Sequence, residues 1–399
     1  MTAERTPGQR GPRLRTTLRR QPKVSSLELF FDLVFALGFT QCTALMVAEP
    51  TWTGVAQGLL ALAVLWWAWA GYAWLTSTVD PDEGAVRIAM FAAMAAMLAV
   101  ALAVPEAFGA LGLTFALAYG VVRGAHIVLF LLASRDDPAL RRSVASLAVS
   151  SAVAVGLLAG AAFLDGIAQA LLWALTILID FGGPALFGVA GWTLVPAHFA
   201  DRHGRILILA LGVSIVALGV AAERGVTPEV IAAAVLGLAL AAALWWLHFD
   251  LVAPATERRL LRAAVGRERN ALARDSYSYL HLPMVAGVIL VAVGLQRALA
   301  GVDEPLPVVP AAALLGGVAI YLLAHVLLQV RTSGPLDVAR LALVFVLPAL
   351  IPVAAAVPTL VTLPGVTVVL WALIAYETRR HRETRAQLRR NLSDEPSPS

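Results

Sequence analysis

Apolar runs of about 20 residues recur along the whole chain, separated by short polar segments. A bilayer core of about 30 Å requires helices of this length, whereas barrel strands are shorter and alternate apolar and polar residues. No such alternation is visible, so the pattern predicts an all-α integral membrane protein with about twelve transmembrane helices. The expected spans are residues 26–47, 54–77, 86–104, 109–133, 143–163, 167–189, 204–222, 229–252, 276–299, 308–330, 337–356 and 359–377.

Helix-breaking residues fall within two of these spans. The stretch Asp180-Phe-Gly-Gly-Pro184 is expected to interrupt the sixth span, because glycine lowers helix stability and proline lacks a backbone N–H. Pro348, Pro352 and Pro358 crowd the eleventh span and its exit. The pattern therefore predicts irregular helices at both places.

Composition supports the membrane assignment. Hydrophobic residues make up 59% of the 399 residues and charged residues 14%, against about 45–50% and about 25% in soluble proteins. Cys42 is the single cysteine, which excludes an intrachain disulfide and a cysteine-based metal site. The histidines show no i, i+4 pair, and His198 and His203 are placed in a loop, so we expect neither a metal nor another cofactor.

Basic residues predict the topology. With twelve spans, all but three of the 30 Lys and Arg residues lie on the side of the termini, and this side is cytoplasmic by the positive-inside rule. Residues 1–24 and 379–399 are then basic cytoplasmic tails, the second one disordered, of a protein of the bacterial cytoplasmic (inner) membrane. We interpret their charge as a topology signal that also contacts lipid headgroups, and we expect no nucleic-acid partner.

Short matches recur in order along the chain and predict an internal repeat. Trp66-Trp67 corresponds to Trp245-Trp246, Ala125-His126 to Ala324-His325, and the Trp-Ala-Leu that precedes Asp180 to the one that precedes Glu377. We therefore expect two six-helix repeats, at residues 25–200 and 201–378. Both begin and end on the cytoplasmic side, so the repeats are parallel and should enclose a central path.

Ionisable residues inside the predicted spans are candidates for that path. Glu28 and Asp32 lie one helical turn apart, and a charge at the bilayer centre costs about 2.5–3.5 kcal/mol on insertion scales. Tyr119, Arg123 and His126 form one polar stripe on the fourth span. Arg123 needs a partner, for which Glu28, Asp32, Asp180 and a ligand anion all qualify. A structural ion pair and a role in transport both remain open.

Further candidates lie in the second half and near the bilayer midplane. His281 and His325 could handle protons or simply form hydrogen bonds, and Trp66 could stack on a ligand or pack between helices. The complete candidate path is Glu28, Asp32, Trp66, Tyr119, Arg123, His126, Asp180, Tyr277, His281 and His325. The charges expected at the cytoplasmic entry are Asp80, Arg87, Arg274 and Asp275.

Several of these motifs together resemble the bacterial low temperature requirement A family. They include the stretch from Leu27 to Gln41, Trp66-Trp-Ala-Trp69, Pro105-Glu-Ala-Phe108, Trp245-Trp246 and the stretch from Arg274 to His281. The resemblance implies a multi-pass inner-membrane protein of a family named for growth in the cold, and it brings no substrate or catalytic residue. Where the family usually has Gly-Glu-Ser, this chain has Val213 between Gly212 and Ser214.

The favoured function is a secondary transporter with a polar path between the halves. The more specific version of this hypothesis is that transport is coupled to protons. Its ligand would be a small molecule or an ion. One alternative is a non-catalytic membrane protein of envelope stress or cold growth, whose polar residues are structural. Another is an intramembrane enzyme acting on lipid or isoprenoid substrates, with Asp80, Asp82 and Glu83 binding a metal and a diphosphate. No residue pattern singles out a substrate, a direction or an oligomeric state.

Overall fold

The computed structural model describes residues 23–82, 84–186, 191–222, 227–332 and 336–380. Within these ranges the regular secondary structure is helical, apart from isolated β-bridge residues such as the pair Pro305 and Pro358. In the part of the chain that the structure describes, eleven helical stretches are long and apolar enough to cross a membrane. The chain is therefore an all-α, multi-pass membrane protein, which confirms the prediction from hydropathy.

The elements follow one another with short connections. The long helices are α1 (Ser26–Ala48), α2 (Trp52–Thr78), α3 (Gly84–Ala103), α4 (Gly112–Ala133), α5 (Pro138–Ala161), α6 (Gly166–Leu186), α7 (Pro196–Ala222), α8 (Pro228–Phe249), α11 (His281–Ala300), α12 (Val308–Arg331) and α15 (Thr359–Arg380). The shorter elements are η1 (Val104–Glu106), α9 (Val252–Arg262), α10 (Arg267–Ala273), the π-helix η2 (Arg274–Tyr279), α13 (Val338–Ala349) and α14 (Ile351–Ala354).

Local sequence signals determine where several helices begin. Ser25 and Glu28 form a capping box at the start of α1: the Ser25 hydroxyl accepts from the Glu28 N–H, and the Glu28 carboxylate accepts from the Ser25 N–H. Asp137 caps α5 and is followed by Pro138, which suits the first helical position. These caps satisfy N–H groups that would otherwise face the bilayer without partners.

Two predictions about the spans were wrong, and the predicted irregularity of the eleventh span was confirmed. Helix α6 is not interrupted at Asp180-Phe-Gly-Gly-Pro184, because Pro184 lies in its last turn. The eleventh span is broken into α13 and the four-residue α14, with Pro348 in the last turn of α13. The seventh helix begins at Pro196, so His198 and His203 lie on α7 and not in a loop.

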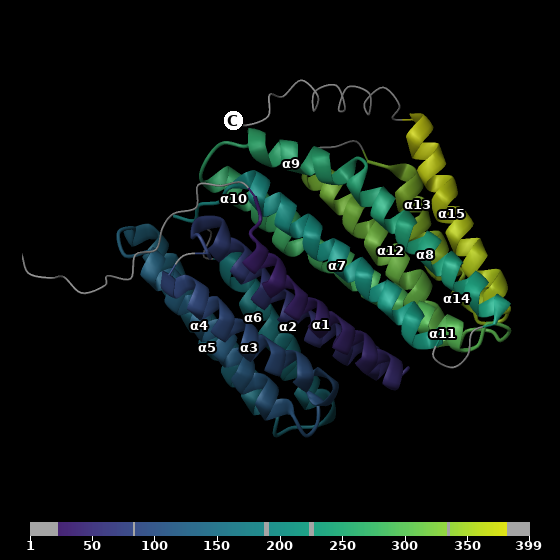
Figure 1. Ribbon diagram of the computed structural model, residues 1–399, viewed down its shortest axis with the longest axis horizontal. Coiled ribbons are helices and arrows are strands. Elements are labelled where there is room, and N and C mark those ends of the chain that lie inside the picture. The colour runs from purple at the N-terminus through teal and green to yellow at the C-terminus, as the bar shows by residue number, and fades with distance from the viewer. Residues whose placement is uncertain (1–22, 83, 187–190, 223–226, 333–335, 381–399) are drawn as a thin grey trace, which may run out of the picture.

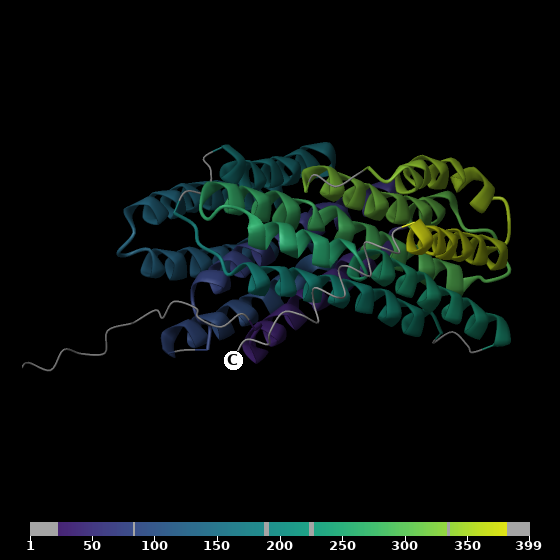
Figure 2. The ribbon, with the colours of Figure 1, turned by 90° about the horizontal axis from the view of Figure 1, so that it is seen from above.

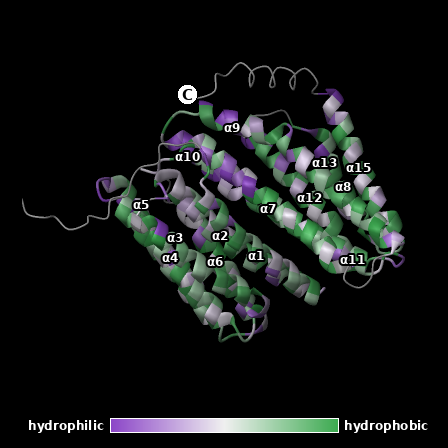
Figure 3. Ribbon diagram, in the orientation of Figure 1, coloured by the Kyte–Doolittle hydropathy of each residue, from purple (hydrophilic) through white to green (hydrophobic). Residues whose placement is uncertain are grey.

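The helices form two groups that lie side by side. Figure 1 shows α1–α6 on one side and α7–α15 on the other, and Figure 2 shows that the molecule is elongated across the two groups. Helices α1 and α2 contact α7 and α11 where the groups meet. We call the side of the molecule on which α1 begins and α15 ends the tail face. Polar residues gather there around α9 and α10, while the middle of the long helices is mostly apolar (Figure 3).

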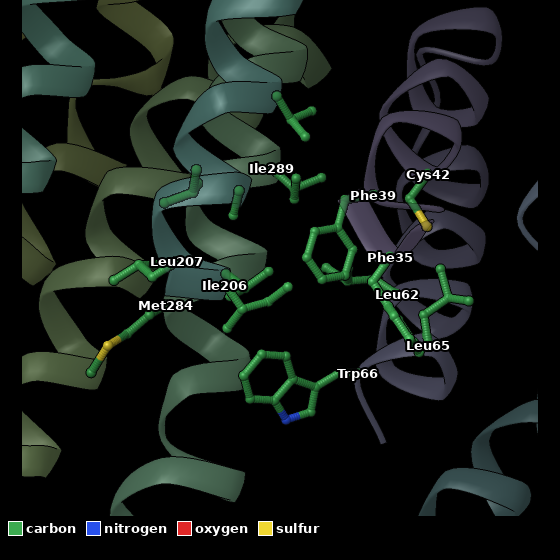
Figure 4. Packing of buried hydrophobic residues seen from close by; sticks show 14 of the residues in the cluster. Phe35, Phe39, Cys42, Leu62, Leu65, Trp66, Ile206, Leu207, Met284 and Ile289 are labelled. Atoms are coloured by element: carbon green, nitrogen blue, oxygen red, sulfur yellow. The ribbon is translucent and has the colours of Figure 1, made fainter. Parts of the chain in front are cut away.

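Apolar side chains fill the contact between the groups. Phe35 and Phe39 of α1 point toward Ile206 of α7 and Ile289 of α11, and all four are fully buried (Figure 4). Between α11 and α12 the packing depends on glycine, since a Cβ on Gly287 would lie 2.5 Å from a backbone carbonyl oxygen of α12. Small residues at such crossings let membrane helices approach closely and gain dispersion energy. The part of the interface formed by Phe35, Phe39, Ile206 and Ile289 is thus a closed apolar layer.

Candidate functional site

A buried ion cluster joins the two groups of helices on the tail-face side of the apolar layer. Arg202 of α7 donates from Nη2 to Asp32 Oδ1 at 3.0 Å and from Nη1 to Glu28 Oε1 at 3.3 Å. All three side chains are fully buried. Asp32 lies six residues beyond the start of α1, or about 9 Å along its axis. The arginine therefore holds two acids of the first group from the second.

Further polar groups complete this cluster. His198, one turn before Arg202, places its Nε2 3.0 Å from Glu28 Oε1, while its Nδ1 lies 3.1 Å from the Ser77 hydroxyl. Trp69 donates from Nε1 to Asp32 Oδ1 at 2.8 Å. The other oxygen of Asp32, Oδ2, is buried and has no hydrogen-bond partner among the described residues. We call Glu28, Asp32, His198 and Arg202 the interface cluster.

The interface cluster shows which residue compensates the charge of the two buried acids on α1. Glu28 and Asp32 are the partners of Arg202, which the sequence analysis did not consider because it began the seventh span at residue 204. The i, i+4 spacing of His198 and Arg202 was the available signal. It becomes informative only once Pro196 is recognised as the start of a helix.

A second buried ion pair lies within the first group. Arg123 of α4 is 3.4 Å from Asp180 Oδ1 on α6 and also donates to the Ser151 hydroxyl. Tyr119 donates its hydroxyl to Asp180 Oδ2 at 3.0 Å. Of the candidate partners for Arg123, the structure thus selects Asp180. Both ring nitrogens of the neighbouring His126 are buried without a hydrogen-bond partner among the described residues.

A third pair, in the second group, was not predicted. Arg340 of α13 forms a two-point contact with Glu377 of α15, with distances of 2.6 and 2.8 Å, and its guanidinium also donates to the Leu247 carbonyl at 3.3 Å. Both side chains are almost completely buried. This pair connects the broken eleventh span to the last helix. Arg340 could not be distinguished by sequence pattern from the other basic residues near the tail face.

Four histidines extend from the interface cluster into the second group. His203 of α7 lies with its ring centroid 4.8 Å from that of Trp69 and 5.4 Å from that of His281. The ring centroids of His281 and His248 are 5.6 Å apart, and His248 Nδ1 lies 3.2 Å from His325 Nε2. Of these four rings, which we call the histidine row, His281 and His325 were predicted as candidates and His203 and His248 were not. All four are buried, and Tyr277 packs against both His203 and His281.

Two tryptophans of α2 donate hydrogen bonds to the π-helix of the second group. Trp66 donates from Nε1 to the Ser278 carbonyl at 2.7 Å, and Trp74 donates to the Ser278 hydroxyl at 2.9 Å. Single-turn π-helices inside longer helices occur frequently at functional sites. Trp66 therefore packs between helices and contacts η2, whose Tyr277 lies beside both His203 and His281.

A pocket of about 460 Å³ lies beside the histidine row, in the second group next to the interface and not within the interface itself. Its volume is in the range of small-molecule sites. It is formed by residues of α7, α8, α9, η2 and α11, and it reaches the surface at the exposed Asp201. The polar and aromatic lining residues are Asp201, Arg205, His248, Phe249, Thr256, Glu257, Tyr277 and His281.

The predicted entry charges lie at the tail face in local contacts. Arg274 pairs with Asp275 at 2.7 Å and donates to the Pro184 carbonyl at 2.9 Å, and Asp275 also pairs with Arg331. Arg87 donates to the Asp82 carbonyl, and Asp80 accepts from the Asp82 N–H at 3.0 Å. Glu83, the third acid of the alternative metal site, lies outside the described residues.

Two observations bear on metals and on Val213. Among the described residues, no group of three or more His, Cys, Asp and Glu side chains is placed to hold a metal ion. Val213 is buried in the apolar core of α7, and the adjacent Ser214 hydroxyl lies 3.5 Å from the Val288 carbonyl. Position 213 therefore contributes no acid in this chain, and the acids that Arg202 contacts are both on α1.

Comparison with known proteins agrees with the motifs. Residues 23–375 match the family model described as bacterial low temperature requirement A protein. An uncharacterized protein of Rhizobium meliloti (strain 1021) is 29% identical over 298 residues, which is 70% of this chain and 70% of that protein. Because the family match covers nearly all described residues, the chain belongs to the bacterial low temperature requirement A family.

Proposed function

We propose that this protein is a proton-coupled secondary transporter of the cytoplasmic membrane, with both termini inside. It is built from two parallel six-helix repeats, and its polar path starts at the interface cluster. The observation that carries the proposal is the contact of Arg202 with Glu28 and Asp32 across the two helix groups. Buried ionisable residues in membrane proteins are costly, and they commonly mark ion and substrate pathways.

The neighbour relationships within the two groups support the repeat. In the first group α1 contacts α2 and α3, and α3 contacts α4; in the second, α7 contacts α8 and α11, and α11 contacts α12. Each group also has a tyrosine bond between its second and fourth long helices. Tyr72 of α2 donates to the Val122 carbonyl of α4, and Tyr321 of α12 donates to the Leu244 carbonyl of α8.

The charge balance of the interface cluster favours proton binding. It contains two carboxyl groups and one guanidinium that stays charged, so a single proton on His198 or on a carboxyl group makes the cluster neutral. A net charge buried away from water raises the free energy of the protein, and binding one proton removes that charge. The unpartnered Oδ2 of Asp32 is one place for that proton. Two acids that share one cation thus form a site that binds and releases protons.

The pocket and the apolar layer support alternating access. The pocket opens at the tail face, and His281 and Tyr277 form part of its wall. Both contact His203, which in turn contacts Trp69, the hydrogen-bond donor to Asp32 of the interface cluster. Beyond the cluster, Phe35, Phe39, Ile206 and Ile289 close the contact between the groups (Figure 4). This arrangement corresponds to a transporter that is open to one side only.

A solute screen in proteoliposomes tests the proposal. Purified protein is reconstituted with an internal pH dye, a pH gradient is imposed, and solutes are added one at a time. We expect at least one solute to accelerate proton movement in the wild type but not in Asp32→Asn. If no solute does so while both the wild type and Asp32→Asn are folded, the result contradicts the proposal and favours a structural role for the interface cluster.

A further inference from the structure

The hydrogen bonds of the histidine row determine which ring atoms can receive a ligand. His281 Nδ1 lies 2.9 Å from the Ser276 carbonyl oxygen. A carbonyl only accepts, so Nδ1 carries the proton, and in a neutral imidazole the lone pair is then on Nε2. His281 lines the pocket, and it therefore brings a hydrogen-bond acceptor there.

The same reasoning applies to His248. His325 Nδ1 lies 2.8 Å from the Tyr321 carbonyl and must donate to it, which leaves the lone pair of His325 on Nε2. That nitrogen is 3.2 Å from His248 Nδ1, so His248 donates from Nδ1 and has its own lone pair on Nε2. His248 also lines the pocket. Two imidazole acceptors thus border one cavity, each fixed by a bond on its far side.

The rest of the lining favours a positive ligand. Asp201 and Glu257 are acidic, and Arg205, which pairs with Asp201 at 3.0 Å, is the basic lining residue. The hydroxyl of Tyr277 is buried with no hydrogen-bond partner among the described residues, and the side chain itself is 3% exposed. The ring of Phe249 also lines the pocket, and aromatic rings attract cations. An anion would instead meet lone pairs and carboxylates.

We propose that the pocket binds a small primary ammonium ion, whose N–H groups donate to Nε2 of His248 and of His281. The inference deepens the proposed function and rests on it, since it names the class of transported solute. A primary ammonium has three N–H donors, enough for both imidazoles. The lining contains two carboxyl groups and one guanidinium, which favours a cation over an anion, and a pocket of about 460 Å³ leaves room for an organic substituent.

Variants can remove one acceptor and keep the structural bond. In His281→Asn the amide N–H₂ can still donate to the Ser276 carbonyl, while the acceptor at Nε2 is lost. His248→Asn does the same toward His325. Arg297→Gln, at the other end of α11, is the matched control because it changes the same helix far from the pocket.

Binding is measured on the full-length protein in detergent at pH 8, by titration calorimetry and by thermal shift. The probes are methylamine, putrescine and benzylamine, with benzyl alcohol and benzoate as neutral and anionic counterparts of benzylamine. We expect at least one amine to bind and to raise the melting temperature, and both counterparts to fail. His281→Asn and His248→Asn should each weaken amine binding roughly tenfold or more, since a hydrogen bond to a charged group is lost. Arg297→Gln should bind as the wild type does.

The outcomes separate this inference from the proposed function. Failure of all three amines to bind, or binding of benzoate or benzyl alcohol as tight as that of benzylamine, would overturn the ammonium site, even if other solutes move protons in liposomes. Unchanged binding in both histidine variants would also overturn it. Amine binding without solute-driven proton movement would support the site and refute the transporter.

Discussion

Arg202 on α7 donates to Asp32 on α1 over 3.0 Å, and through this contact the two groups of helices share one buried charge cluster. The arginine also donates to Glu28, to the Tyr72 carbonyl and to the Thr76 hydroxyl, so its position depends on both α1 and α2. A rearrangement of the groups must therefore break or exchange these contacts. The interface cluster is therefore a candidate for controlling the relative position of the two groups as well as for holding them together.

Removal of the arginine alone should be costly. Arg202→Met leaves two buried carboxyl groups without their fixed cation, and breaking a buried pair in this way typically costs about 3–5 kcal/mol. Adding Glu28→Gln and Asp32→Asn should recover a large part of that loss, because the unpaired charges disappear. Thermal unfolding in detergent measures both effects. A triple variant no more stable than Arg202→Met would show that the pairing contributes little.

The Arg340–Glu377 pair should be structural. Glu377→Gln disrupts a two-point contact between almost fully buried groups, with an expected loss of about 3–5 kcal/mol as an upper range. Glu268→Gln is the matched control, since its pair with Arg259 spans 3.8 Å at the surface and should be worth about 0–1 kcal/mol. Equal melting temperatures for the two variants would contradict this interpretation.

Gly71 keeps space for the side chains that lie between α2 and α4. A Cβ at this position would lie 2.9 Å from His126 Cε1 and 3.3 Å from Arg123 Nη1. We expect Gly71→Ala to destabilise the protein by roughly 1–3 kcal/mol through overpacking. His126→Ala in the same chain should relieve the strain. If the double variant is less stable than the sum of the single effects implies, the clash is not the cause.

The α11–α12 crossing should tolerate no side chain at Gly287. An added Cβ would lie 2.5 Å from the Gly317 carbonyl oxygen, and backbone cannot move aside as a flexible side chain can. Gly287→Ala should therefore lower stability by roughly 1–3 kcal/mol or more. In contrast, Gly316→Ala meets nothing within 4 Å and should be neutral or slightly stabilising in a helix. Similar melting temperatures would contradict the proposed close approach.

Hydropathy was enough to predict the helices, because membrane insertion depends on the summed polarity of about 20 residues. It placed the first span at 26–47, and α1 is Ser26–Ala48. It failed for α7, whose first turns contain His198, Arg202 and His203 and resemble a loop in polarity. Those residues are polar because they contact α1 and α2, and hydropathy takes no account of partners on other helices.

The partners within the site were harder to predict. Three acids were available for Arg123, and only the packing of α4 against α6 selects Asp180. Arg340 and Glu377 are 37 residues apart, near the start of α13 and the end of α15, and become neighbours only in the packed structure. Such choices depend on how helices are rotated and shifted against each other, which short motifs do not encode. The family itself was recognised from motifs and is confirmed by the match over residues 23–375.

The most direct test of the account compares two Glu→Gln variants in proteoliposomes with the internal pH dye and a solute that drives proton movement. Glu28 belongs to the interface cluster and Glu377 to a structural pair, and both side chains are buried. We predict that Glu28→Gln abolishes solute-driven proton movement and that Glu377→Gln retains it once equal amounts of folded protein are reconstituted. Equal rates in the two variants would contradict the assignment of proton coupling to the interface cluster.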